Sequence, residues 1–188
     1  MAGQDKKKSI STKKGDRGET SLFDGTRVSK ASLRPEVYGT LDEASAFLGL
    51  ARAKSGDPEI QAILVELQTQ IYLVNAELAC PPEAKDRLNH RFEKEHFDAL
   101  EARAREIEKT LDLPPRFVLY GETEAGAALD VARAVVRRAE RALTLLHEAE
   151  PEDNPLVKPF VNRLSDMLYL LARREEKKAG RPWRHPEA

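Results

Sequence analysis

Apolar residues recur at intervals of three and four positions along almost the whole chain, and this spacing constrains the fold more than any other feature of the sequence. Residues three and four apart share one face of an α-helix, so the spacing indicates amphipathic helices. Five such helices predict an all-α fold, a five-helix bundle of near-parallel and antiparallel neighbours. The predicted helices run from Pro35 to Gly56, over about 60–78, from His90 to Leu111, from Thr123 to beyond Leu146, and from Asn154 to Ala179.

The length and composition of the chain suit one soluble domain. Its 188 residues can bury a sizeable core without a metal or a disulfide, and no apolar run approaches the roughly 18 residues of a membrane span. We expect residues 1–10 to be a flexible leader without the apolar stretch of a signal peptide, 11–180 to form the single domain, and 181–188 to be a tail. The lone Cys80 excludes an internal disulfide and fits a reducing cytoplasm, with its thiol buried and inert.

Charge is unevenly distributed along the chain. The net charge of −1 argues against a general nucleic-acid binder. Residues 1–34 nevertheless contain nine Lys or Arg and four Asp or Glu, whereas the remainder contains 22 and 28. A basic N-terminal segment on an otherwise acidic chain indicates a local anion-binding site. The run from Lys6 to Lys8 is better explained as a solvated tail.

The basic N-terminal segment includes a glycine-punctuated stretch, STKKGDRGETSLFDGTRVSK, at residues 11–30. Its glycines allow close approach of the backbone, and successive backbone N–H groups together with Lys and Arg side chains can cradle phosphates. The stretch does not match the Walker A pattern. A flexible basic loop therefore remains an alternative to a phosphate-binding loop.

The fourth predicted helix carries the most informative polar pattern. Asp130, Arg133, Arg137 and Glu140 are spaced by 3, 4 and 3 positions, which places them on one flank beside the apolar seam. Arginine forks match phosphate oxygens, so the flank is a candidate oligophosphate site. An exposed row of ion pairs is the alternative.

Two other helices carry polar residues beside their apolar seams. Asn162, Ser165, Asp166 and Tyr169 share a face of the fifth helix and could contact a ribose or a base, or else bond to neighbouring helices. Asp42 on the first helix most simply forms an ion pair with a neighbouring helix.

Other kinds of site find little support. The four histidines are scattered without metal-ligand spacing, and no nucleophile motif or dinucleotide-binding fingerprint occurs. The connector RFVLYGE, at residues 116–122, has an apolar middle and is predicted to pack inward.

Several stretches together resemble the PduO-type ATP:cob(I)alamin adenosyltransferases over roughly residues 10–175. They are the glycine-punctuated strip, PEVYGTLDEASAFLGLARA, LQTQIYLVNAELA, FVLYGETEAGAALDVARAVVRRAER and NPLVKPFVNRLSDMLYLLAR. The resemblance implies transfer of the 5′-deoxyadenosyl group of ATP to the cobalt of reduced cobalamin, with Mg²⁺ on the phosphates. It also implies a homotrimer with active sites between subunits, with a corrinoid reductase and an adenosylcobalamin-dependent enzyme as further partners. No nucleic-acid or membrane partner is expected.

The resemblance assigns nucleotide contacts by matched position. Arg137 would contact ATP, Glu140 would orient it or help to hold Mg²⁺, and Asn162 would contact the nucleotide. The strip at residues 11–30 becomes the nucleotide loop. Its matched residues are Thr12, Lys13, Gly15, Asp16, Gly18, Thr20, Ser21 and Lys30.

The expected catalytic set is Arg137 with three further residues. Asp42 matches an acidic residue that pairs with an arginine of a neighbouring subunit, for which Arg133 is the candidate. Phe117 matches an aromatic residue that helps to clear the lower face of cobalt. Arg138 and Arg141 belong to the same helix motif but point elsewhere, which suggests structural or interface roles.

At three places the chain departs from the family pattern. It has LYGE at 119–122 where LPGG is common, Asp130 where a histidine is common, and Lys14 where a small residue is usual. The first two lie near the expected corrinoid side. Two other functions stay open: a module that binds ATP or adenosylcobalamin without synthesis, and a structural bundle whose arginines only form ion pairs.

Overall fold

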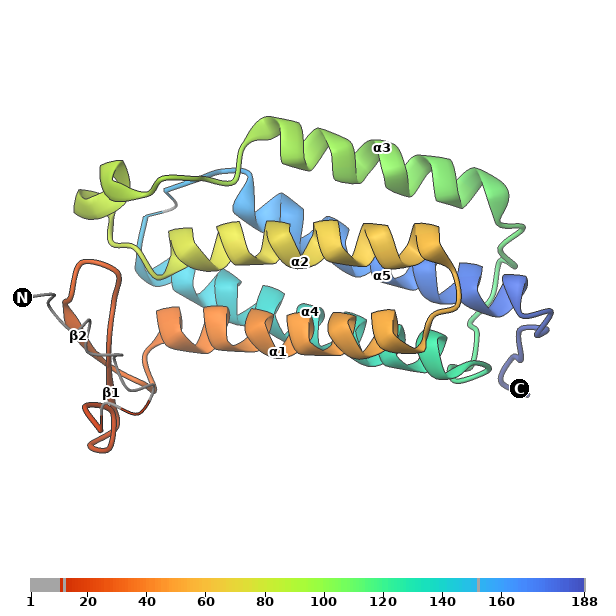
Figure 1. Ribbon diagram of the computed structural model, residues 1–188, viewed down its shortest axis with the longest axis horizontal. Helices are drawn as coiled ribbons and strands as arrows, with labels where there is room; N and C mark the ends of the chain where they lie inside the picture. Colours follow the sequence, from red (N-terminus) through yellow and green to blue (C-terminus); the bar gives the residue numbers. More distant parts are fainter. Residues whose placement is uncertain (1–10, 12, 152, 188) are drawn as a thin grey trace, which may run out of the picture.

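The computed structural model describes residues 11, 13–151 and 153–187. In this part of the chain five α-helices form an elongated bundle, which confirms the predicted fold class (Figure 1). Its long helices are α1 (Leu33–Lys54), α2 (Pro58–Leu78), α3 (Lys94–Thr110), α4 (Glu124–Ala149) and α5 (Val157–Lys178). Helix α1 packs against α4 and α2, α4 also packs against α5, and α3 lies outside on α5. None of these described helices is long and apolar enough to cross a membrane.

Side-chain caps explain where two of the helices begin. The Asp57 carboxylate accepts a hydrogen bond from the backbone N–H of Glu59 at 3.0 Å, and Pro58 occupies the first turn of α2. Thr123 caps α4 as predicted, and its hydroxyl accepts from the backbone N–H of Gly126 at 3.0 Å. These bonds satisfy donors that the first helical turn leaves without intrahelical partners.

The third helix begins later than the apolar spacing predicts. It starts at Lys94 rather than at His90, because Glu93 and His96 form a reciprocal capping box. In this box the Glu93 backbone N–H donates to Nδ1 of His96 at 3.0 Å.

The fifth helix also begins later, at Val157 rather than at Asn154. The Asn154 side chain accepts from the backbone N–H of Leu156 at 3.0 Å and donates to the Glu77 carboxylate on α2 at 3.0 Å. These two bonds hold Asn154 in a turn outside the helix.

The core is built from the predicted apolar seams. In α1 and α4 the seam residues have no exposed surface, because each helix turns one face to the other along its length. Cys80 is also fully buried, and burial raises the pKa of its thiol above the ordinary value. The seam residues of these two helices at zero exposure are Val37, Leu41, Ala44, Leu48, Ala51, Leu129, Ala132, Val136, Ala139 and Leu143.

The prediction that the 116–122 connector packs inward is largely wrong. Val118 is buried, but Phe117 is 85% exposed and Leu119 and Tyr120 are about half exposed. The C-terminal residues hold this connector by its backbone: Leu119 N–H donates to the Arg184 carbonyl at 2.8 Å. The connector is thus held through its backbone, and of its apolar residues only Val118 reaches the core.

The N-terminal strip contains a short hairpin that lies beyond the bundle, near the start of α1 (Figure 1). Strands β1 (Glu19–Ser21) and β2 (Arg27–Ser29) are antiparallel, with Thr20 opposite Val28. The backbone N–H of Phe23 donates to the Ala79 carbonyl at 2.8 Å, just after α2. The strip is therefore docked on the bundle.

Candidate functional site

Tight turns bring the first part of the nucleotide loop close to the end of β2. The backbone N–H of Gly18 donates to the Gly15 carbonyl at 3.2 Å, and Lys30 N–H donates to the Gly18 carbonyl at 2.8 Å. Gly18 has a φ of 80°, which side-chain-bearing residues rarely adopt. Arg27, which sequence reasoning missed, ties the turn to the hairpin by donating to the Lys14 carbonyl at 2.9 Å.

Lys30 reaches across the turn to Gly15. A Cβ atom at Gly15 would lie 3.0 Å from Nζ of Lys30, so the glycine makes room for the ammonium group. Thr20 faces Tyr38 on α1 instead: burial raises the pKa of Tyr38, and a hydrogen bond with the Thr20 side chain opposes that rise. Thr12 lies outside the described residues.

The polar flank of α4 divides into three parts. Asp130 is buried and lies near Arg133, with Oδ1 3.7 Å from the arginine Nε. At the other end Glu140 accepts a hydrogen bond from the Asn162 amide of α5 at 2.7 Å. In the described part of the chain the Arg137 side chain, which lies between them, has no hydrogen-bond or ion-pair partner.

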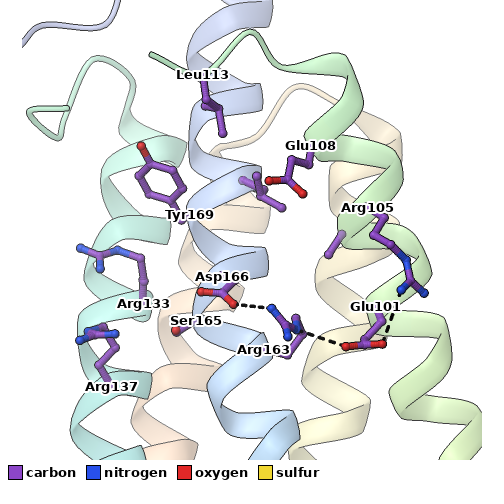
Figure 2. A pocket seen from close by; sticks show the side chains of 12 residues that line it. Glu101, Arg105, Glu108, Leu113, Arg133, Arg137, Arg163, Ser165, Asp166 and Tyr169 are labelled. Carbon is purple, nitrogen blue, oxygen red and sulfur yellow. Dashed lines mark hydrogen bonds and ion pairs between the residues drawn. The ribbon is translucent and has the colours of Figure 1, made fainter. Parts of the chain in front are cut away.

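A cavity of about 510 Å³ opens between α3, α4 and α5 beside this flank. Figure 2 shows Arg133 and Arg137 one above the other on α4, with α3 across from them. Ser165, Asp166 and Tyr169 of α5 lie between, as the shared face of that helix predicts.

Most cationic side chains around this cavity already have anionic neighbours. Arg163 lies 2.8 Å from Asp166 and 3.5 Å from Glu101. Arg105 lies 3.8 Å from the same Glu101. Among the described arginines of this wall, Arg137 alone faces the cavity without such a neighbour, which makes it the group best suited to bind an anion.

A second cavity, of about 420 Å³, lies under the connector and shares Arg133 and Tyr169 with the first. Phe117, Val118 and Tyr120 form its other side. The guanidinium carbon of Arg133 lies 5.0 Å from the centre of the Tyr120 ring, a cation–π distance. The two cavities are thus separated by one wall of arginine and tyrosine.

Behind this wall lies a buried ion cluster that sequence reasoning missed. Arg173 of α5 donates to Asp130 Oδ2 at 2.6 Å and has its Nε 2.8 Å from Glu176 Oε2, and all three side chains are at most 4% exposed. Burial raises the pKa of both carboxyl groups, against the opposing effect of Arg173. A signal was present, because Tyr169, Arg173 and Glu176 continue the polar spacing of α5 by steps of 4 and 3.

The structure does not bring the nucleotide loop and the arginine flank together within one chain. No hydrogen bond or ion pair links described loop residues to Arg137, Glu140 or Asn162, and the hairpin lies beyond the bundle end while Arg137 is midway along α4 (Figure 1). Asp42 is exposed on α1 and has no partner within the described residues. Arg138 forms an ion pair with the neighbouring Glu43.

No metal cage is visible in this region. Across residues 11, 13–151 and 153–187, no three His, Cys, Asp or Glu side chains lie together in a way that could hold a metal ion. Glu140 therefore stands as a single carboxylate.

Comparison with known proteins places this arrangement in a family. A family model described as cobalamin adenosyltransferase matches residues 10–175. The chain is 39% identical over 170 residues to the corrinoid adenosyltransferase PduO of Salmonella typhimurium, covering 90% of this chain and 50% of that protein. It is 38% identical over 170 residues to the corrinoid adenosyltransferase of Bacillus subtilis, covering 86% of this chain and 83% of that protein.

A solved structure agrees with the sequence comparison. It is a single-residue variant of the PduO-type ATP:corrinoid adenosyltransferase of Lactobacillus reuteri, complexed with cobalamin and ATP. Its TM-score to this chain is 0.87 at 27% identity, covering 96% of this chain and all of that one.

The chain is thus a helical bundle with the fold of that solved structure. The chain belongs to the cobalamin adenosyltransferase family, as the resemblance predicted. It spans about half the length of the two relatives called PduO.

Proposed function

We propose that this chain is an ATP:corrinoid adenosyltransferase, which transfers the 5′-deoxyadenosyl group of ATP to Co(I) of a reduced corrinoid and releases triphosphate. The observation that carries the proposal is the unpaired Arg137 guanidinium, which faces a 510 Å³ cavity beside the Glu140–Asn162 pair. A guanidinium without a protein partner is ready to form bidentate bonds with phosphate oxygens. The similarity to a complex with cobalamin and ATP supports both substrates.

The nucleotide site forms between subunits of a homotrimer. The loop around Lys30 and the flank around Arg137 both suit an anion but lie apart in one chain, so the loop of one subunit closes over the flank of its neighbour. The exposed Asp42 is then available to an arginine of another subunit, with Arg133 as its partner.

An exposed apolar stripe supports such an interface. The Glu43–Arg138 ion pair sets the register of antiparallel α1 and α4. Leu50 and Val131 lie seven positions from that pair on their respective helices, which brings them side by side, and they are 47% and 43% exposed. Exposed apolar side chains that lie side by side on two helices are available for contact with another subunit.

Glu140 fits the role of holding Mg²⁺ together with the phosphates. Mg²⁺ in nucleotide sites is bound through substrate phosphates, water and one or two carboxylates rather than by an all-protein cage. Glu140 is one such carboxylate, and the Asn162 amide fixes its orientation. When bound, Mg²⁺ would neutralise charge on the leaving triphosphate.

The reaction needs positioning rather than proton transfer. The Co(I) electron pair forms the bond to the 5′-carbon, while the bond from that carbon to the phosphate oxygen breaks and its electrons leave with triphosphate. Arg137 and Lys30 stabilise the charge that develops on this leaving group. No general base is required, which agrees with the scattered histidines.

The exposed Phe117 ring lies at the second cavity and keeps water from the lower face of the corrinoid.

The test is an anaerobic assay with ATP, Mg²⁺ and chemically reduced cobalamin, followed by the loss of the cob(I)alamin spectrum and the growth of light-sensitive adenosylcobalamin. We expect turnover by the wild-type protein and almost none by Arg137→Ala. Arg103→Ala is the matched control. It removes a partly exposed helix arginine whose nearest carboxylate is 4.0 Å away and which lies outside both cavities.

Three outcomes separate the alternatives. Wild-type turnover that Arg137→Ala retains would contradict the role of this arginine. ATP that raises the melting temperature without forming product would favour a binding module of the same fold. Absence of both effects would favour a structural bundle.

A further inference from the structure

The cluster of Arg173, Asp130 and Glu176 is buried, and a buried ion is costly unless it is paired. Arg173 pairs with both carboxylates, at 2.6 Å to Asp130 and 2.8 Å to Glu176. Two carboxylates exceed one guanidinium by a full charge. The second cation near this cluster is Arg133, 3.7 Å from Asp130.

The two carboxylates differ in what they touch. Glu176 pairs with Arg173, which lies wholly inside the protein. Asp130 pairs with Arg173 through Oδ2 and with Arg133 through Oδ1. Of the two carboxylates, Asp130 is therefore the one that contacts a side chain lining both cavities, Arg133.

The same link reaches the connector through Tyr120. The guanidinium carbons of Arg133 and Arg173 lie 5.0 Å and 5.7 Å from the centre of the Tyr120 ring, and that of Arg173 lies 5.1 Å from the centre of Tyr169. Tyr120 is 55% exposed, so packing alone does not fix it. Its position depends on two guanidinium groups, and Asp130 pairs with both of them.

We propose that Asp130 is a positioning residue for the corrinoid: by holding Arg133 and Arg173 it fixes the wall of Arg133, Tyr120 and Tyr169 between the two cavities, and it sets corrinoid affinity without contacting the substrate. This inference rests on the proposed adenosyltransferase activity. Positions 120 and 130, two of the three departures from the family pattern, thereby belong to one contact network. Arg137 and the nucleotide loop lie outside that network, so ATP affinity should change much less than corrinoid affinity when the network is disturbed.

The experiment compares two isosteric changes of buried carboxylates, Asp130→Asn and Glu176→Gln, in the anaerobic assay. Both remove one charge that pairs with Arg173, so both lower the melting temperature. We expect Asp130→Asn to raise the KM for the corrinoid roughly five- to tenfold and to leave the KM for ATP within about twofold. Glu176→Gln should raise the corrinoid KM less than Asp130→Asn does, because Glu176 contacts Arg173 alone and leaves the Asp130–Arg133 pair in place.

A second variant keeps the test decisive if Asp130→Asn does not fold. Tyr120→Leu changes a half-exposed side chain and removes the ring that the two guanidinium groups hold. Like Asp130→Asn, it should raise the KM for the corrinoid without changing the KM for ATP. If both variants fold, the double variant should be no worse than the more severe single one, because the two residues act through one contact network.

Several results would overturn the inference. Equal corrinoid KM values for Asp130→Asn and Glu176→Gln would show that Asp130 acts only on stability. An unchanged corrinoid KM in Tyr120→Leu would contradict the role of the wall. An ATP KM that rises as much as the corrinoid KM would contradict a specific effect on the corrinoid. A wild-type protein without turnover would overturn the proposed function and this inference with it, whereas an active wild type with unaffected variants would overturn the inference alone.

Discussion

Glu77, near the end of α2, offers the sharpest test of how the bundle is held together. Its carboxylate is 2% exposed and accepts hydrogen bonds from the Phe92 backbone N–H at 2.7 Å and from the Asn154 side-chain amide at 3.0 and 3.1 Å. Arg91 adds an ion pair at 3.4 Å. One side chain thereby connects α2 with the segments that lead into α3 and α5.

Replacing Glu77 with alanine leaves two donors, the Phe92 N–H and the Asn154 amide, without this acceptor. An unsatisfied buried donor costs about 1–3 kcal/mol, so the change should lower the free energy of unfolding by about 2–6 kcal/mol. For a chain of this size that corresponds to a fall in Tm of roughly 5–20 °C. Glu77→Gln should lose less, because its carbonyl oxygen still accepts from Phe92 while its amide faces that of Asn154.

The measurement is thermal and urea unfolding followed by circular dichroism. Glu83→Ala is the matched control, since Glu83 is exposed on the neighbouring 3-10 helix η1 (Pro82–Arg87), and it should stay within about 0.5 kcal/mol of wild type. A Glu77→Ala protein with the Tm and the urea midpoint of Glu83→Ala would refute the reasoning.

Two further predictions concern the loop and the buried thiol. Gly15→Ala should displace the Lys30 ammonium, which a Cβ would meet at 3.0 Å. We therefore expect a higher KM for ATP and an unchanged Tm, and a normal KM would remove Lys30 from the phosphate site. Cys80 should react slowly with a thiol reagent in the folded protein, because burial both blocks access and raises its pKa, which lowers the fraction of thiolate at a given pH. Rapid reaction without unfolding would contradict this.

The helical fold could be predicted because apolar periodicity is a local property of the sequence. All five helices follow from steps of three and four, and Thr123 caps α4 where the sequence places it. The starts of α3 and α5 could not be predicted in the same way. The start of α3 depends on the capping box of Glu93 and His96, which apolar spacing does not reveal, and the start of α5 depends on Asn154, whose partner Glu77 is far away in the sequence.

For the site, the sequence could predict only which residues share one face of a helix. Spacing placed Asp130, Arg133, Arg137 and Glu140 on one flank, but it could not show what each touches. Tertiary neighbours decide that, because Arg173 draws Asp130 into the interior and Asn162 engages Glu140. The exposure of the connector depends likewise on its contact with the C-terminal residues.

This division of the flank explains how one arginine stays available to an anion on a helix rich in carboxylates. Glu140 lies three positions from Arg137, a spacing at which the two side chains could pair and neutralise each other. The Asn162 amide engages the Glu140 carboxylate at 2.7 Å instead. At the other end Asp130 is occupied by Arg173 and Arg133. Each carboxylate of the flank therefore already has a partner other than Arg137, so the charge of Arg137 stays uncompensated within the described residues and faces the cavity. An incoming triphosphate can then bind to it without first breaking an ion pair within the protein.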